Sequence, residues 1–245
     1  MKNIIILLVL ICSVAVIIVS CAKKEESTTA AAAGDAAGTG TTASGTITGD
    51  DNLTGTFNMS WYGQEPSGGC IDNSTAITSF KTLSAVPNDT LGYKQQIIFT
   101  SSTTWAKSIQ YYSDASCATL TGYMNVGYKN VSVGDSLSGL SAGSNPAKPT
   151  TAKKVSYNMD FTALKCNTDT CTTFFNTLFG SSTLDTLGFT QGTELNVDDT
   201  DEAAKVNIWE TGAMSGSSKT YLFTGSEATS TYPTGWSSAS VWWQE

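Results

Sequence analysis

The stretch VSYNMDF at residues 155–161 decides the fold class, because apolar and polar side chains alternate along it. Its odd-numbered residues are Val, Tyr, Met and Phe, and the residues between them are Ser, Asn and Asp. Side chains two apart on a strand share a face, so the pattern predicts a half-buried β-strand with these four apolar residues on one side. The segment 56–61 repeats it with Phe57, Met59 and Trp61.

Further segments have strand character, and clusters of Gly, Asn, Asp and Ser between them have the chemistry of turns. These segments are 95–100, 107–113, 122–128, 204–209, 220–223 and 239–243. Helical spacing is weak at Ile77, Phe80 and Lys81. A helix or turn that plugs the core is expected where Phe174, Phe175, Leu178 and Phe179 lead to a terminating Gly180.

About eight antiparallel strands with one apolar face must close on themselves or pair as two layers, because an open sheet exposes both its edges and that face. We therefore expect an all-β fold, an antiparallel up-and-down barrel that is lipocalin-like. A β-sandwich uses the same strand pattern and is the alternative. A barrel of about eight strands has an interior filled by side chains or by one small ligand.

The N-terminal residues predict export. Lys2 precedes an apolar run over residues 4–19, which has the character of a signal-peptide core and is shorter than the roughly 20 apolar residues of a spanning helix. The run closes with IVSC at residues 18–21, which resembles the lipobox of bacterial lipoproteins. An uncleaved membrane anchor flanked by Lys23 and Lys24 is the alternative reading.

The lipobox resemblance implies cleavage after Ser20 and acylation of Cys21 by chains such as palmitate. Ala22 stands where Asp signals inner-membrane retention in many such proteins, so the resemblance also implies a cell outer membrane location, periplasmic or surface-exposed. We expect residues 1–20 to be the signal peptide and residues 21–51 to be the lipidated cysteine and a disordered tether. The tether is rich in Ala, Gly, Thr and Ser, and residues 52–245 form the barrel domain.

The composition argues against several function classes. The formal net charge is −8, and the basic residues are 13 Lys with no Arg. Affinity for nucleic acid depends on clustered basic residues, so nucleic acid is not an expected partner. The chain has no His, the usual general base and the commonest metal ligand. We therefore expect no enzyme, no catalytic residue, no cofactor and no metal site; the motif GLSAG at residues 139–143 lacks the His that its serine would need.

Four cysteines remain once Cys12, in the signal peptide, and Cys21 are set aside. An even number in an oxidising compartment predicts disulfides. Three pairings are possible. We prefer Cys166 with Cys171, because the four residues between them can form a turn, and hence Cys70 with Cys117.

Several short strings resemble lipocalin-like barrels of the APCDD type. They are Trp61 ahead of Cys70, the segment YYSDASC at residues 111–117, and YLFTG at residues 221–225 followed by Pro233. The resemblance implies a bent barrel with an apolar cavity, and binding rather than catalysis. We expect a small apolar ligand or lipid to bind in this cavity, and the aromatic residues expected to bind it are Trp61, Tyr111, Tyr123, Trp209 and Trp242.

A second hypothesis, from another class, is a cell-surface interaction or adhesion protein. Such a protein would bind a macromolecule through loops and outward-facing Trp and Tyr, and it would carry a contiguous exposed aromatic patch. The sequence leaves the identity of the ligand or partner and the oligomeric state open.

Overall fold

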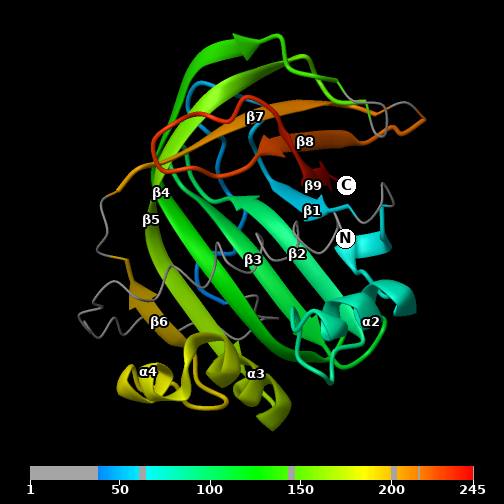
Figure 1. Cartoon of the computed structure of the whole chain (residues 1–245), viewed down its shortest axis with the longest axis vertical. Helices are drawn as coiled ribbons and strands as arrows, with labels where there is room; N and C mark the ends of the chain where they lie inside the picture. Colours follow the sequence, from blue (N-terminus) through cyan, green and yellow to red (C-terminus); the bar gives the residue numbers. More distant parts are fainter. Residues whose placement is uncertain (1–37, 61–64, 143–146, 200–202, 215, 245) are drawn as a thin grey trace.

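The computed structural model describes residues 38–60, 65–142, 147–199, 203–214 and 216–244, and this part of the chain is dominated by β-strands (Figure 1). The strands are β1 (Thr56–Met59), β2 (Gly92–Phe99), β3 (Trp105–Tyr112), β4 (Leu120–Ser138), β5 (Thr151–Cys166), β6 (Leu195–Asp198), β7 (Lys205–Ala213), β8 (Thr220–Gly225) and β9 (Trp236–Gln244). Each of the eight segments that the sequence assigns to strands overlaps one of them. β6 was not predicted.

Strand pairing closes the sheet into a barrel. The strand order is β4-β3-β2-β1-β9-β8-β7-β5-β6, and β4 also pairs with β5. Within the described residues this extra pairing joins the eight strands other than β6 into a ring in which every pairing is antiparallel. Strands that pair in the ring are consecutive in the sequence, except for the pairs β5–β7 and β9–β1. The all-β, up-and-down barrel is therefore confirmed.

A β-bulge changes the face of one predicted inward residue. Gly127 on β4 pairs with Phe161, but the next residue, Tyr128, pairs with Met159, which leaves Asp160 as an extra residue on β5. Phe161 is thereby shifted to the face opposite Met159. The prediction that the four apolar residues of 155–161 share one face is wrong for Phe161, because the bulge interrupts the period of two.

The ring is complete over part of the strand length. β5 pairs with β7 from residue 153 to 157 and then with β6 from residue 161 to 164. On the other side, β1 pairs with β2 only at residues 96–98. We call the part in which β1, β7, β8 and β9 complete the ring the closed half. In the remainder, the open half, the wall of β2 to β6 continues as a curved sheet with helices at its end (Figure 1).

The segment before β1 covers the end of the closed half. Ile47 and Leu53 are fully buried in the same apolar cluster as the barrel interior, and the backbone N–H of Thr48 donates to Ser102 in the β2–β3 turn. The carboxylate of Asp50, itself buried, lies 3.0 Å from Nζ of Lys153. Residues 38–51 were assigned to the tether from their composition, so the packed part of the chain extends beyond the domain boundary expected at residue 52.

Three α-helices lie outside the barrel wall in the described chain: α2 (Ser74–Thr82), α3 (Asp169–Phe179) and α4 (Ser181–Thr186). α2 contains the residues with weak helical spacing, and α3 shows that the expected helix or turn before Gly180 is a helix. The hydroxyl of Thr168 caps α3 by accepting from the backbone N–H of Cys171, and Gly180 ends the helix at a φ of 87°. Among the described residues, no helix combines the length and apolar character that crossing a membrane requires.

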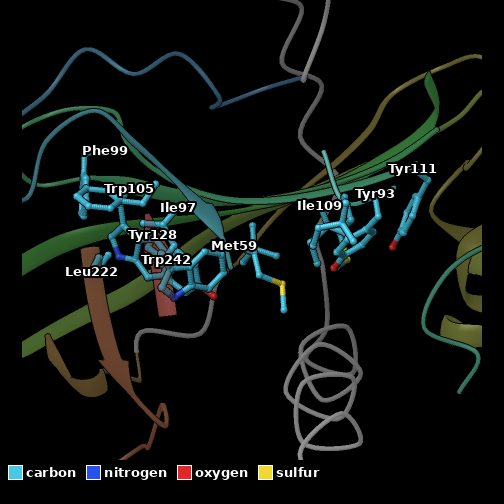
Figure 2. Packing of buried hydrophobic residues seen from close by; sticks show 14 of the residues in the cluster. Met59, Tyr93, Ile97, Phe99, Trp105, Ile109, Tyr111, Tyr128, Leu222 and Trp242 are labelled. Carbon is cyan, nitrogen blue, oxygen red and sulfur yellow. The ribbon is translucent and has the colours of Figure 1, made fainter. Parts of the chain in front are cut away.

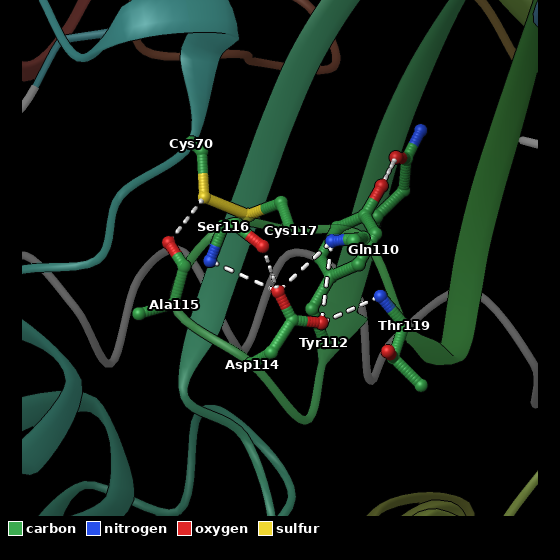
Figure 3. Close-up of a disulfide and its surroundings, with 9 residues drawn as sticks. Cys70, Gln110, Tyr112, Asp114, Ala115, Ser116, Cys117 and Thr119 are labelled. Carbon is green, nitrogen blue, oxygen red and sulfur yellow. Dashed lines mark hydrogen bonds between the residues drawn. A yellow bond between two sulfur atoms is a disulfide. The ribbon is translucent and has the colours of Figure 1, made fainter.

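The disulfides join Cys70 to Cys117 and Cys166 to Cys171, as the sequence predicts. Both lie at the helical end of the open half. The first ties the segment before α2 to the β3–β4 turn, where Asp114 accepts hydrogen bonds from Ser116, Ala118 and Thr119 (Figure 3). These bonds, that from Ser116 foremost, hold the pKa of Asp114 well below its ordinary value.

We expect the two disulfides to stabilise the fold unequally. The cross-linked residues are 47 apart for Cys70–Cys117 and 5 apart for Cys166–Cys171. Because a cross-link that closes a longer loop restricts the unfolded chain more, replacing both members by Ala should lower the free energy of unfolding by about 4 kcal/mol for the first pair and about 2 kcal/mol for the second. Urea unfolding of the two double variants measures the losses, and equal losses would contradict this account.

Candidate functional site

The inner face of the barrel is set by strand register. On β3, Trp105, Lys107, Ile109 and Tyr111 point to one side, and their partners on β2 include Phe99 and Ile97. The same alternation continues around the ring through Met124, Leu164, Trp209, Leu222, Trp242 and Met59. Apart from Lys107, each of these side chains is buried. The labelled members in Figure 2 all lie on one side of the sheet.

An aromatic cluster fills the closed half. Its members are Phe57, Phe99, Trp105, Tyr128, Tyr157 and Trp209. The rings of Trp105 and Tyr128 are stacked with centroids 4.0 Å apart, and Trp105 meets Trp209 edge to face at 5.1 Å. Such contacts add stability beyond that from area burial. The barrel is therefore packed by its own side chains at this end.

The inner face remains apolar in the open half. Ile109, Met124 and Leu164 continue it on neighbouring strands. At its far end Tyr111 packs against Phe174 of α3, with ring centroids 5.6 Å apart. The apolar surface thus runs from the aromatic cluster to α3.

Several buried N–H groups on the inner face have no hydrogen-bond partner. The indole Nε1 atoms of Trp105, Trp209 and Trp242 are unpartnered, and these side chains are 5 %, 1 % and 5 % exposed. The Oε1 atom of Gln95 accepts from the hydroxyl of Tyr93 at 3.0 Å, but its Nε2 atom has no partner. Leaving a buried donor unsatisfied costs about 1–3 kcal/mol. In a purely structural core, these unsatisfied groups would lower the stability of the fold.

Lys107 brings a positive charge to the inner face. Its cross-strand partners are Ile97 and Val126, and Trp105 and Ile109 precede and follow it on the same face. No described residue forms a salt bridge with it. Burial lowers the pKa of Lys107, and the carboxylate of Glu227 opposes that shift. The residue nevertheless keeps some solvent-accessible surface.

A polar group adjoins the aromatic cluster. The hydroxyl of Tyr157 donates to the carboxylate of Glu227 at 2.9 Å, and the amide of Asn207 donates to that hydroxyl at 3.4 Å. Glu227 lies in the exposed connection between β8 and β9. Burial first, and then the carboxylate of Glu227, raise the pKa of Tyr157 and of Tyr128 well above the ordinary value. Both phenols therefore stay protonated across the physiological pH range.

The structure brings three of the five aromatic residues predicted to bind ligand onto the inner face: Tyr111, Trp209 and Trp242. Tyr123 lies on the outer face because it alternates with Met124, and its hydroxyl donates to Glu194. It therefore does not line the interior. Trp61 lies outside the described residues, as does the predicted lipidation site Cys21.

Sequence reasoning missed Trp105, Lys107 and Tyr157 as site residues. The strand prediction began at Lys107 and so excluded Trp105. The signal for Lys107 is present in the segment WAKSIQYY at residues 105–112, where every second residue from Trp105 is apolar except the lysine. A charge on the apolar face of a strand is the pattern that could have identified it.

The described residues contain no group of three or more Cys, Asp or Glu side chains placed to hold a metal ion. Comparison with known proteins gives no family either. No protein-family model matches the chain, and no curated protein matches it.

We expect Lys107→Met to stabilise the ligand-free protein. Near neutral pH the free energy of unfolding should rise by roughly 1–3 kcal/mol, because the variant no longer buries an unpaired ammonium among apolar side chains. The pKa of Lys107 in the folded chain is below its ordinary value of 10.5, so the unfolded chain holds the proton more tightly. Wild-type stability then rises with pH between these two values, and the advantage of the variant shrinks there.

Urea unfolding of both proteins near neutral pH and at about pH 10 tests this expectation. Lys94→Met is the matched control, since Lys94 points to the outer face on the adjacent strand β2. A Lys107→Met variant that is less stable near neutral pH would show that the ammonium makes a stabilising contact.

Proposed function

We propose that the protein is a membrane-anchored bacterial lipoprotein that binds a small apolar ligand in its barrel and does not catalyse a reaction. The observation that carries the proposal is the inner face, which combines continuous apolar surface with buried N–H groups that lack partners. Apolar lining with a few polar groups that fix orientation is the composition of small-molecule sites. The barrel fold supports the resemblance to lipocalin-like proteins, in which binding replaces catalysis.

The unpartnered groups support binding over a structural role. Buried polar atoms in folded proteins nearly always have partners, so each exception needs a cause. The amide of Gln95 on β2 and the indole of Trp105, next to Lys107 on the inner face of β3, would each gain a hydrogen bond from a ligand with acceptor atoms. A ligand that satisfies them would recover free energy that the ligand-free barrel forgoes.

The ligand would lie in the open half. In the closed half the aromatic cluster occupies the interior, whereas Lys107 one row further along keeps accessible surface. The neighbouring residues Ile109, Met124 and Leu164 offer an apolar wall. A ligand there would lie between the aromatic cluster and α3.

The anchor part of the proposal rests on the lipobox. Acyl chains on Cys21 would hold the protein on the membrane, since burying each CH₂ contributes about 0.8 kcal/mol and several chains act together. The disulfides support an exported location, because such bonds persist in oxidising compartments. We propose the outer membrane as the destination, on the strength of Ala22 after the cysteine.

The alternative of a surface adhesion protein has less support in the described structure. That function calls for a contiguous patch of exposed aromatic residues. Among the described residues, Leu91 is the large hydrophobic side chain that is exposed, at 50 %. Three aromatic residues of the outer face, Tyr221, Phe223 and Trp243, are buried in a cluster of their own.

Native mass spectrometry tests the carrier function. The full chain, purified with its disulfides intact from its natural host, is expected to retain an apolar compound that dissociates when the protein is denatured. The compound should be absent from a Met124→Ala, Leu164→Ala variant, which removes two side chains of the apolar wall paired across β4 and β5. A ligand-free mass for the wild type, repeated under several mild extraction conditions, would argue against the carrier.

Labelling with radioactive palmitate tests the anchor. The wild type should incorporate the label and have a protein part that lacks residues 1–20, whereas Cys21→Ser should incorporate none. Cys12→Ala, which alters a cysteine inside the apolar run, should label as the wild type does. An unlabelled wild type that retains residues 1–20 would instead indicate an uncleaved membrane anchor.

A further inference from the structure

The unpaired polar atoms of the inner face share one property, which is that they donate hydrogen bonds. An indole nitrogen has a donor and no acceptor, and an ammonium has three donors. Trp105 and Lys107 are successive inward residues on β3, roughly 7 Å apart along the strand. A lining of donors is complementary to a ligand that offers acceptors.

The positive charge of Lys107 indicates which kind of acceptor atom the ligand carries. An ammonium with apolar neighbours in a partly desolvated site interacts most strongly with an anion. Glu227 is the described acid whose charge acts on Lys107, yet the two are not within salt-bridge distance. The carboxylate of Glu227 instead accepts from the hydroxyl of Tyr157. Lys107 thus lacks a direct counter-ion from the described chain.

We infer that the barrel binds an amphipathic monocarboxylate, with its carboxylate at Lys107 and its apolar chain along Ile109, Met124 and Leu164. This inference rests on the proposed function and adds the chemical class of the ligand. The indole N–H of Trp105 is the nearest donor along the strand that could share the carboxylate with Lys107. The carboxylate would satisfy donors that the ligand-free protein leaves without partners.

A single negative charge fits the site better than a multiply charged head such as a phosphate. The chain has no Arg, so no guanidinium is present to bind phosphate through paired hydrogen bonds. The carboxylate of Glu227 also lies close enough to Lys107 to act on it, which disfavours further negative charge. The net charge of −8 acts in the same direction.

Quenching of tryptophan fluorescence by bromine tests the inference. The full chain in lipid nanodiscs is titrated with ω-bromoundecanoate and, separately, with ω-bromoundecanol, and empty nanodiscs give the partitioning background. The two probes share their chain and bromine and differ in the head group. A chain that enters the barrel brings its bromine close to the inward indoles.

We expect the wild type to bind the carboxylate at least about tenfold more tightly than the alcohol, the effect of one hydrogen bond to a charged group. Lys107→Met should lose this preference and bind the alcohol as the wild type does. Lys94→Met, on the outer face, should keep the preference. Thermal unfolding followed by circular dichroism establishes that each variant is folded.

The outcomes separate this inference from the proposed function. If neither probe quenches the wild type above background, the carrier function itself is contradicted. If both probes bind equally, or Lys107→Met keeps the preference for the carboxylate, the barrel is a carrier but the inference about Lys107 is overturned. The comparison of acid and alcohol on the wild type decides the point even if a variant fails to fold.

Discussion

The pairing of β1 with β9 is the contact on which the rest of the barrel depends. Asn58 and Met59 pair with Trp243 and Trp242, so the first and last strands of the ring are joined from opposite ends of the described chain. Without this contact both strands would be sheet edges, and the apolar face would be open to water. Once the ring is closed, alternate side chains of each strand point into the interior. They include indoles as well as the ammonium of Lys107.

Stability and the proposed binding therefore depend on different parts of the barrel along its axis. The closed half is stabilised by aromatic rings in direct contact, although the indoles of Trp105, Trp209 and Trp242 are left without hydrogen-bond partners. One row further, Lys107 stands where an apolar residue would fit the same register. We expect a lysine at this position to weaken the fold, and the proposed binding gives a reason for its presence there. Burying unpaired donors is thus the structural basis of the proposed binding.

Much of this arrangement could be predicted from the sequence, because alternation and turn residues are local signals. The eight ring strands, α2, α3 and both disulfide pairings follow from such signals. The bulge at Asp160 does not, because it depends on the register of β4 against β5, and it alone reverses the face of Phe161. β6 has four residues, and residues 38–51 have a linker composition, so their packing depends on tertiary contacts such as that of Asp50 with Lys153. The inward position of Lys107 could have been predicted from the sequence, because this lysine interrupts an otherwise apolar face of the strand.

The two disulfides stabilise the open half, in which β1, β7, β8 and β9 do not complete the ring. In the open half, the described residues add only an isolated bridge of Ile71 to Tyr93 on the β1 side of β2, and both disulfides lie at the end of this half. Gly92 and Gly122 make room for them, because a Cβ at either position would overlap a disulfide sulfur. Since the cross-links restrict the unfolded chain, they replace part of the stability that further strand pairing would supply. Because such cross-links persist in oxidising compartments, the stability of this half agrees with the exported location that we propose.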